Sequence, residues 1–136
     1  ALAEDGHLVI CCGGGGIPVY RTEKNHLKGA AAVIDKDFAS ELLAEQLDAD
    51  MLIILTAVEK VAINFRKENE QWLDSMTPEE AQTYIAQGQF APGSMLPKVE
   101  AAVKFAQSKS SRVALITLLE KARDGIAGRT GTVIRQ

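Results

Sequence analysis

The sequence predicts a three-layer αβα sandwich with a mainly parallel β-sheet. Short apolar runs of strand length alternate with amphipathic helical segments, and the runs at 51–55 and 113–117 are almost wholly apolar. Such runs are typical of strands that helices cover on both faces. With 136 residues the chain has the size of one domain, so residues 1–136 are expected to form a single domain.

The first part of the chain is predicted to begin with a strand at His7–Cys12 that runs into the four glycines 13–16. Glycines at a strand end allow a tight turn or a close approach to a ligand, because they carry no Cβ. Segment 17–33 is ambiguous, and a strand over Ala30–Ile34 is expected to follow. A helix is then predicted over Asp37–Leu47, whose apolar residues share one face.

The remaining elements are predicted to alternate in the same way. The sequence Thr77-Pro78-Glu79-Glu80 combines a capping-box spacing with a proline at the first helical position. The predicted helices are Pro78–Gln87, one that begins near Pro97, and a short one at Leu118–Arg123. The predicted strands are Met51–Leu55, Val61–Phe65, Val113–Thr117 and, at the sheet edge, Thr132–Ile134.

Composition excludes several classes of function. The formal charge is −3 and the basic residues are scattered, so no nucleic-acid partner is expected. The longest nearly uninterrupted apolar stretch, 51–58, is far shorter than the roughly 20 residues of a membrane span. No secretory signal pattern is visible, and the adjacent Cys11 and Cys12 suit a reducing compartment, so a cytoplasmic location is expected.

The glycines 13–16 match neither the dinucleotide-binding fingerprint nor the phosphate loop of P-loop enzymes. A third glycine is lacking at the required spacing, and no Lys-Ser or Lys-Thr follows. Backbone N–H groups of Gly13, Gly14 and Gly15 remain candidates to cradle an anion, and a simple tight turn is the alternative. The residues alone leave both interpretations open.

Two lysines are placed near predicted helix starts. Lys36 lies between Asp35 and Asp37, with Asp37 a candidate cap, and Lys98 follows Pro97. A cation is disfavoured at the positive end of a helix unless an anion shares the site. Together with the glycines, these lysines indicate a polyphosphate site, although each alone is most simply a surface residue.

Other candidate residues give weaker indications of function. Met95, Phe65 and Tyr84 either line an apolar slot for a base or belong to the core. Cys11 and Cys12 with His7 and His26 match no zinc pattern, so no protein-bound metal is predicted. No serine has the surroundings of a hydrolase nucleophile.

Five segments taken together resemble the carbamate kinases of the amino-acid kinase fold. They are CGGGGIPV at 12–19, AVIDKD at 32–37, ILT at 54–56, FAPGSMLPKVE at 90–100 and GRTGT at 128–132. The segments span essentially the whole chain and keep the family's order. The Gly-Ser-Met-x-Pro-Lys string favours carbamate kinase over acetylglutamate or uridylate kinases.

The resemblance implies reversible phosphoryl transfer between ATP and carbamate, with Mg²⁺ between the phosphates. Lys36 is implied to contact the transferring phosphoryl group, Asp37 to orient the charges around it, and Lys98 to bind the nucleotide's phosphates. Gly13, Gly14, Gly15 and Asp35 are implied on the nucleotide side, with Phe65 and Met95 enclosing the adenine. Phe65 stands where many members have tyrosine, so a hydroxyl is lost.

Carbamate kinases are about twice as long, so the chain resembles their C-terminal, nucleotide-binding half. The N-terminal half that holds carbamate is absent, and the 136 residues alone are expected to be inactive. The family also implies a homodimer, and leaves arginine or purine breakdown open as the pathway. The alternative is a non-catalytic nucleotide-binding or interaction module left by truncation.

Overall fold

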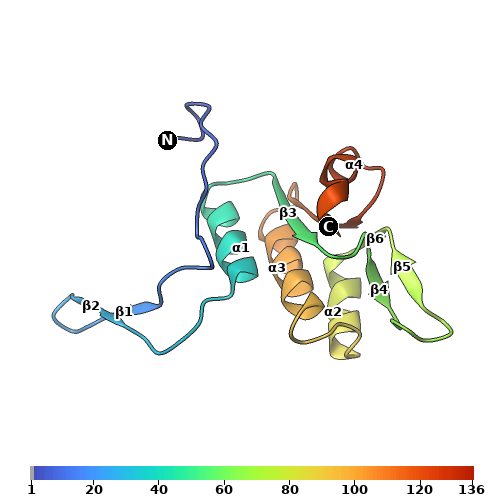
Figure 1. The fold of residues 1–136 in the computed structure, drawn as a ribbon, viewed down its shortest axis with the longest axis horizontal. Helices are drawn as coiled ribbons and strands as arrows, with labels where there is room; N and C mark the ends of the chain where they lie inside the picture. Colours follow the sequence, from blue (N-terminus) through green and yellow to red (C-terminus); the bar gives the residue numbers. More distant parts are fainter. Residues whose placement is uncertain (1) are drawn as a thin grey trace. The chain divides into compact units, whose positions relative to one another are not determined.

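The structure is a computed structural model that describes residues 2–136, and Figure 1 shows its elements. The contacts within the chain divide it into two units, Ala1–Ser40 and Glu41–Gln136. The first unit contains one β-hairpin and the start of helix α1 (Lys36–Gln46), and the second contains all remaining elements. The expectation of a single domain stays a prediction.

The hairpin of the first unit lies in the segment that the sequence left ambiguous. Strand β1 (Val19–Arg21) pairs antiparallel with β2 (Leu27–Gly29). The turn between them is closed by the Thr22 side chain, whose Oγ1 accepts a hydrogen bond from the His26 N–H at 3.1 Å. Asn25 adopts a positive φ of 61° in this turn, a conformation that asparagine tolerates better than most residues.

The strands predicted at His7–Cys12 and Ala30–Ile34 are wrong. Both segments are irregular, and neither pairs with another strand within residues 2–136. Leu8 and Ile10 are fully exposed, at 101% and 99% of their reference areas. An apolar run becomes a strand only where a neighbour accepts and donates its ladder hydrogen bonds, and the described residues supply none here.

The central sheet of the second unit has the strand order β3-β7-β8-β6. β3 (Met51–Thr56) runs parallel to β7 (Val113–Leu118), and β6 (Ser75–Met76) runs parallel to β8 (Thr132–Ile134), whereas β7 and β8 are antiparallel. The predicted α/β class with a mainly parallel sheet is therefore confirmed. The placement of Thr132–Ile134 at the edge is wrong, because the two-residue strand β6 pairs with its outer side.

Helices cover β7 on both faces, which makes three layers. On one face Ala114 and Ile116 join the core that includes Phe105 of α3 (Met95–Ser108). On the other face Leu115 approaches Gly125 of α4 (Ala122–Ile126) so closely that a Cβ there would lie 3.0 Å from its Cδ2. Complete burial explains the continuous apolar run of β7.

β3 differs from β7 although both runs look alike in the sequence. It is an edge strand among the described residues, and its side chains alternate between buried and exposed. Met51 and Leu55 are each 40% exposed. The expectation that both faces of this strand are covered is wrong, because α3 packs on only one of them within residues 2–136.

The predicted helices are present, with shifted ends. α2 (Pro78–Ala86) has the predicted capping box, in which the Thr77 Oγ1 accepts from the Glu80 N–H at 3.2 Å and the Thr77 N–H donates to Glu80 Oε2 at 2.8 Å. α2 packs against α3 (Figure 1). α3 begins two residues before Pro97, whose missing N–H is harmless in the first turn. The short C-terminal helix consists of the 3₁₀ turn η1 (Leu119–Lys121) followed by α4.

A second hairpin lies beside the sheet. Of its two strands, the sequence predicts only the first. Its strands are β4 (Val61–Ile63) and β5 (Gln71–Leu73), paired antiparallel. The buried Thr132 hydroxyl of β8 joins both strands to the sheet. It accepts from the Val61 N–H at 2.8 Å and donates to the Leu73 carbonyl at 2.6 Å.

An ion pair between a buried glutamate and a half-exposed lysine connects α1 to α3 within the second unit. The Glu41 side chain is wholly buried, and its Oε2 accepts from Lys104 Nζ at 2.7 Å. Glu41 Oε1 has no hydrogen-bond partner among the described residues. Burial is the main cause that raises the pKa of Glu41 above its ordinary value of 4.5; the neighbouring carboxyl group of Glu45 raises it further, and Lys104 opposes both.

We expect Thr132→Val to lower the free energy of unfolding by about 1–3 kcal/mol, because a buried N–H and a buried C=O lose their shared partner. Denaturant unfolding measures the change. Thr83→Val is the control, since the Thr83 hydroxyl is exposed on α2 and its loss should change stability by less than about 0.5 kcal/mol. Equal losses in the two variants would contradict the proposed bridge.

We expect Glu41→Gln to gain stability relative to the parent chain as the pH rises from 4 to 7. The raised pKa means that the folded chain holds the Glu41 proton more tightly than the unfolded chain does. Stability is therefore lost as the pH rises from about 4.5 through the folded pKa, and glutamine removes this loss. Unfolding curves at several pH values test it, with exposed Glu79→Gln as the control. If the difference in unfolding free energy between Glu41→Gln and the parent chain does not depend on pH, the prediction is wrong.

Candidate functional site

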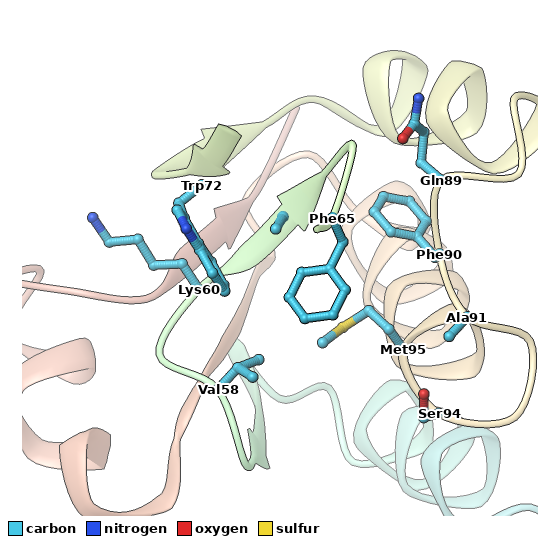
Figure 2. A pocket seen from close by; sticks show the side chains of 10 residues that line it. Val58, Lys60, Phe65, Trp72, Gln89, Phe90, Ala91, Ser94 and Met95 are labelled. Atoms are coloured by element: carbon cyan, nitrogen blue, oxygen red, sulfur yellow. The ribbon is translucent and has the colours of Figure 1, made fainter. Parts of the chain in front are cut away.

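A pocket of about 180 Å³ opens in the second unit, between the β4–β5 hairpin and the segment that leads into α3. Most of its lining is apolar, and Figure 2 shows the side chains around it. Its lining residues are Val58, Lys60, Ala62, Phe65, Trp72, Gln89, Phe90, Ala91, Ser94 and Met95. The pocket thus has one wall from the hairpin and one from the start of a helix.

Phe65 and Met95, which the sequence analysis considers as an apolar slot, both line this pocket. The end of the Met95 side chain lies next to the Phe65 ring (Figure 2). Trp72 meets Phe65 edge to face, with ring centroids 6.1 Å apart and planes at 86°. Tyr84 packs against the core and is not part of the lining. This arrangement suits a flat, apolar ring.

Polar groups lie at the rim of the pocket, and the sequence analysis missed them. Lys60 Nζ pairs with Asp74, and in Figure 2 its amine points away from Phe65 and Met95. The Gln89 amide makes hydrogen bonds with Asn64. The lining residue Trp72 was also missed; the one feature of the sequence that could have drawn attention to it is that it is the single tryptophan of the chain. Gln89 had no such feature, because a glutamine in a loop has no pattern of its own.

The start of α3 lies at the same pocket. Ser94 lines it and stands at the N-cap position, and its side chain makes no capping hydrogen bond within residues 2–136. Lys98 is half-buried on the same helix, one turn further on. Because Ser94 and Lys98 are four residues apart, both lie on one side of α3. Lys98 itself is not among the lining residues.

The glycine loop and the start of α1 lie together in the first unit. Gly15 is buried with a φ of +129°, and a Cβ on it would lie 2.5 Å from the Ile34 carbonyl oxygen. Two loop amides close tight turns, since the Gly13 N–H donates to the Cys11 carbonyl and the Gly15 N–H to the Cys12 carbonyl. The loop is therefore a tight turn that also brings backbone against the residues just before Asp35.

At the start of α1 the cap is Asp35 and not Asp37, which corrects the sequence interpretation. Asp35 Oδ1 accepts from the Asp37 N–H at 2.8 Å, the bond expected of an N-cap side chain. Asp37 is instead largely buried in the first turn, with its Oδ2 4.0 Å from Lys36 Nζ. Lys36 is 63% exposed. A mobile cation beside a fixed carboxylate suits contact with an anionic group.

A search of residues 2–136 for metal ligands found no group of three or more His, Cys, Asp or Glu that could hold an ion. Cys11 and Cys12 are both free thiols. In this part of the chain no helix is long and apolar enough to cross a membrane.

The fold and the pocket define an α/β protein with an apolar pocket beside a helix start. The amino acid kinase family model matches residues 1–117, so the chain belongs to the amino acid kinase family. This confirms the family inferred from the five sequence segments.

Known relatives and solved structures agree with this. The chain is 67% identical over 136 residues to the carbamate kinase-like protein YqeA of Escherichia coli K12, covering 100% of this chain and 44% of the relative. It is 53% identical over 133 residues to carbamate kinase of Clostridium perfringens, covering 98% and 42%. The carbamate kinase of Giardia lamblia bound to AMP-PNP superposes with a TM-score of 0.93 at 43% identity, covering 98% and 42%. The chain thus spans less than half the length of these relatives.

We expect Gly15→Ala to destabilise the first unit, because its Cβ would overlap the Ile34 carbonyl at a φ that L-residues rarely adopt. The cost should be about 1–3 kcal/mol, seen as faster amide exchange around Gly15 and Ile34. Gly14→Ala is the matched control, since a Cβ there has no atom within 4 Å among the described residues. Unchanged exchange in Gly15→Ala would show that the close approach is not formed.

Proposed function

We propose that the chain supplies the ATP/ADP site of a carbamate kinase, which transfers a phosphoryl group reversibly between ATP and carbamate. In the reverse direction ADP and carbamoyl phosphate give ATP and carbamate. The observation that carries the proposal is the Phe65–Met95 pocket beside the start of α3, in a chain that resembles a carbamate kinase solved with AMP-PNP.

The pocket is proposed to hold the adenine ring. Phe65 is half-exposed and offers one ring face, and the Met95 thioether offers a polarisable surface beside it. Both contacts tolerate any flat ring of the right size, so they supply affinity, whereas hydrogen bonds at the rim would supply selection among bases.

The phosphate-binding roles are proposed residue by residue, as the resemblance to carbamate kinases implies them. Lys98 binds the nucleotide's phosphates, and Lys36 contacts the transferring phosphoryl group while Asp37 orients it. Gly13, Gly14, Gly15 and Asp35 complete the nucleotide side. The 4.0 Å separation of Lys36 Nζ and Asp37 Oδ2 supports the pairing of these two roles. Catalysis then rests on positioning and charge stabilisation, without a covalent intermediate.

Magnesium is proposed to enter with the nucleotide. Mg²⁺ keeps several waters and binds substrate phosphates through few protein carboxylates. When bound, the ion neutralises phosphate charge. A cytoplasmic homodimer is the proposed setting, with carbamate and carbamoyl phosphate as the other small-molecule partners.

A non-catalytic nucleotide-binding or interaction module is the second candidate. It is favoured by one finding, that a relative 67% identical to the chain is named carbamate kinase-like and not carbamate kinase. The two candidates differ in turnover. The parent protein of an enzyme fragment makes ATP from ADP and carbamoyl phosphate, and a module makes none in any form.

Calorimetric titration with Mg–ADP tests the nucleotide site. We expect Phe65→Ala and Lys98→Ala each to weaken binding by about tenfold, through lost stacking and lost charge respectively. Lys24→Ala is the control, because Lys24 is an exposed residue of the β1–β2 turn. If both site variants bind ADP as tightly as the control does, the site assignment is wrong. Carbamoyl-phosphate-dependent ATP synthesis by the pure 136-residue chain would overturn the expectation that it is inactive alone.

A further inference from the structure

We propose that Gln89 is a positioning residue, which holds the backbone turn that presents Phe65 to the pocket. The turn is unusual, because the residues on both sides of Phe65 have positive φ, 52° at Asn64 and 62° at Arg66. Non-glycine residues rarely adopt this conformation, and they keep it only where surrounding bonds enforce it.

Gln89 supplies the hydrogen bonds that hold Asn64 in this conformation. Its Oε1 accepts from the Asn64 N–H at 2.8 Å, and its Nε2 donates to Asn64 Oδ1 at 3.3 Å. One amide side chain therefore holds both the backbone and the side chain of Asn64. These bonds reach from the loop after α2 to the end of β4, across 25 positions of sequence.

Arg66, the second residue with positive φ, is held by a separate hydrogen bond within the hairpin. The Arg66 N–H donates to Glu70 Oε2 at 2.7 Å, and the Arg66 guanidinium lies 5.3 Å from the Phe65 ring centroid. Both positive-φ residues thus have their N–H groups bound by side chains. Of these two bonds, the Gln89 bond is the one that connects the turn to the opposite wall of the pocket, because Glu70 belongs to the hairpin itself.

Gln89 is anchored on its own side. The next residue, Phe90, is 4% exposed and belongs to the core, and the Gln89 N–H donates to the Tyr84 carbonyl at 3.0 Å. A fixed backbone, together with a side chain held by two hydrogen bonds, sets the distance between the two walls. Phe65, by contrast, is 49% exposed, so its place over the pocket depends on the turn more than on burial.

Gln89 acts through Phe65 in this proposal, and its effect on nucleotide affinity rests on the proposed function. Its effect on the turn does not. The chain has one tryptophan, Trp72, which contacts Phe65 edge to face, so tryptophan emission reports this hairpin alone. The turn is therefore measurable without any ligand.

The first experiment compares Gln89→Met, Gln89→Glu and the control Gln82→Met, using the whole chain and no nucleotide. Methionine keeps the length of the side chain and loses both bonds, whereas glutamate keeps an acceptor for the Asn64 N–H. Gln82 is exposed on α2. We expect Gln89→Met to increase acrylamide quenching of Trp72 about twofold, and Gln89→Glu and Gln82→Met to leave it near the parent value. Circular dichroism confirms that each variant is folded.

The second experiment measures Mg–ADP affinity in a double-mutant cycle with Phe65→Ala. We expect Gln89→Met to weaken binding about fivefold in the parent chain and to have no further effect when Phe65 is already alanine. An equal loss in both backgrounds would show that Gln89 acts directly on the ligand or on the whole fold, and would overturn the proposal.

The two experiments separate the two claims. If the parent chain does not bind ADP, the proposed function fails, and the quenching series alone decides whether Gln89 holds the turn. If quenching is the same in Gln89→Met and Gln82→Met, the positioning role is wrong, whatever the ADP affinity.

Discussion

The pocket depends on one buried hydroxyl, that of Thr132. The β4–β5 hairpin has only three residues in each strand, and isolated hairpins of this size are marginal in water. Thr132 Oγ1 accepts a hydrogen bond from the Val61 N–H and donates one to the Leu73 carbonyl, so one group joins both strands to β8. The Thr117 hydroxyl adds a weaker bond to the Glu59 carbonyl at 3.3 Å. The wall that carries Phe65 and Trp72 is thus fixed from the sheet side by threonines.

Local signals account for the parts of the fold that the sequence predicted well. The capping box at Thr77–Glu80 and the apolar run at Val113–Thr117 each contain the information that decides their structure. β3 and β7 show the limit of such signals, because Met51–Leu55 is as apolar as β7 and is nevertheless an edge strand among the described residues. A sequence run shows which residues can be buried, and the neighbours decide which ones are.

The candidate site shows the same contrast between residues that the sequence indicates and residues whose role depends on distant neighbours. The residue types alone indicate Met95, Phe65 and Tyr84 as either slot or core, and the resemblance to carbamate kinases implies Phe65 and Met95. The structure places these two at one pocket and Tyr84 against the core. The groups that hold the pocket open are Gln89, Asn64 and Thr132, and their bonds link positions 25 to 71 residues apart. Asn64 has positive φ where the distant Gln89 side chain binds its N–H, whereas the N–H of Arg66 is bound by the nearby Glu70. Single-sequence patterns contain no trace of such pairings.

The two helix starts with lysines differ in their electrostatics. A helix start carries a partial positive charge, which acidic side chains or an anion can neutralise. At α1 the chain provides its own acids, since Asp35 caps the helix and Asp37 lies in the first turn. At α3 the first turn has no acid, and Ser94 makes no side-chain capping bond within residues 2–136. α3 therefore lacks the negative charge that α1 already has, while Ser94 faces the pocket and Lys98 lies one turn beyond it. This difference makes the start of α3 the better electrostatic match for an anion, whereas the start of α1 already has carboxylates of its own.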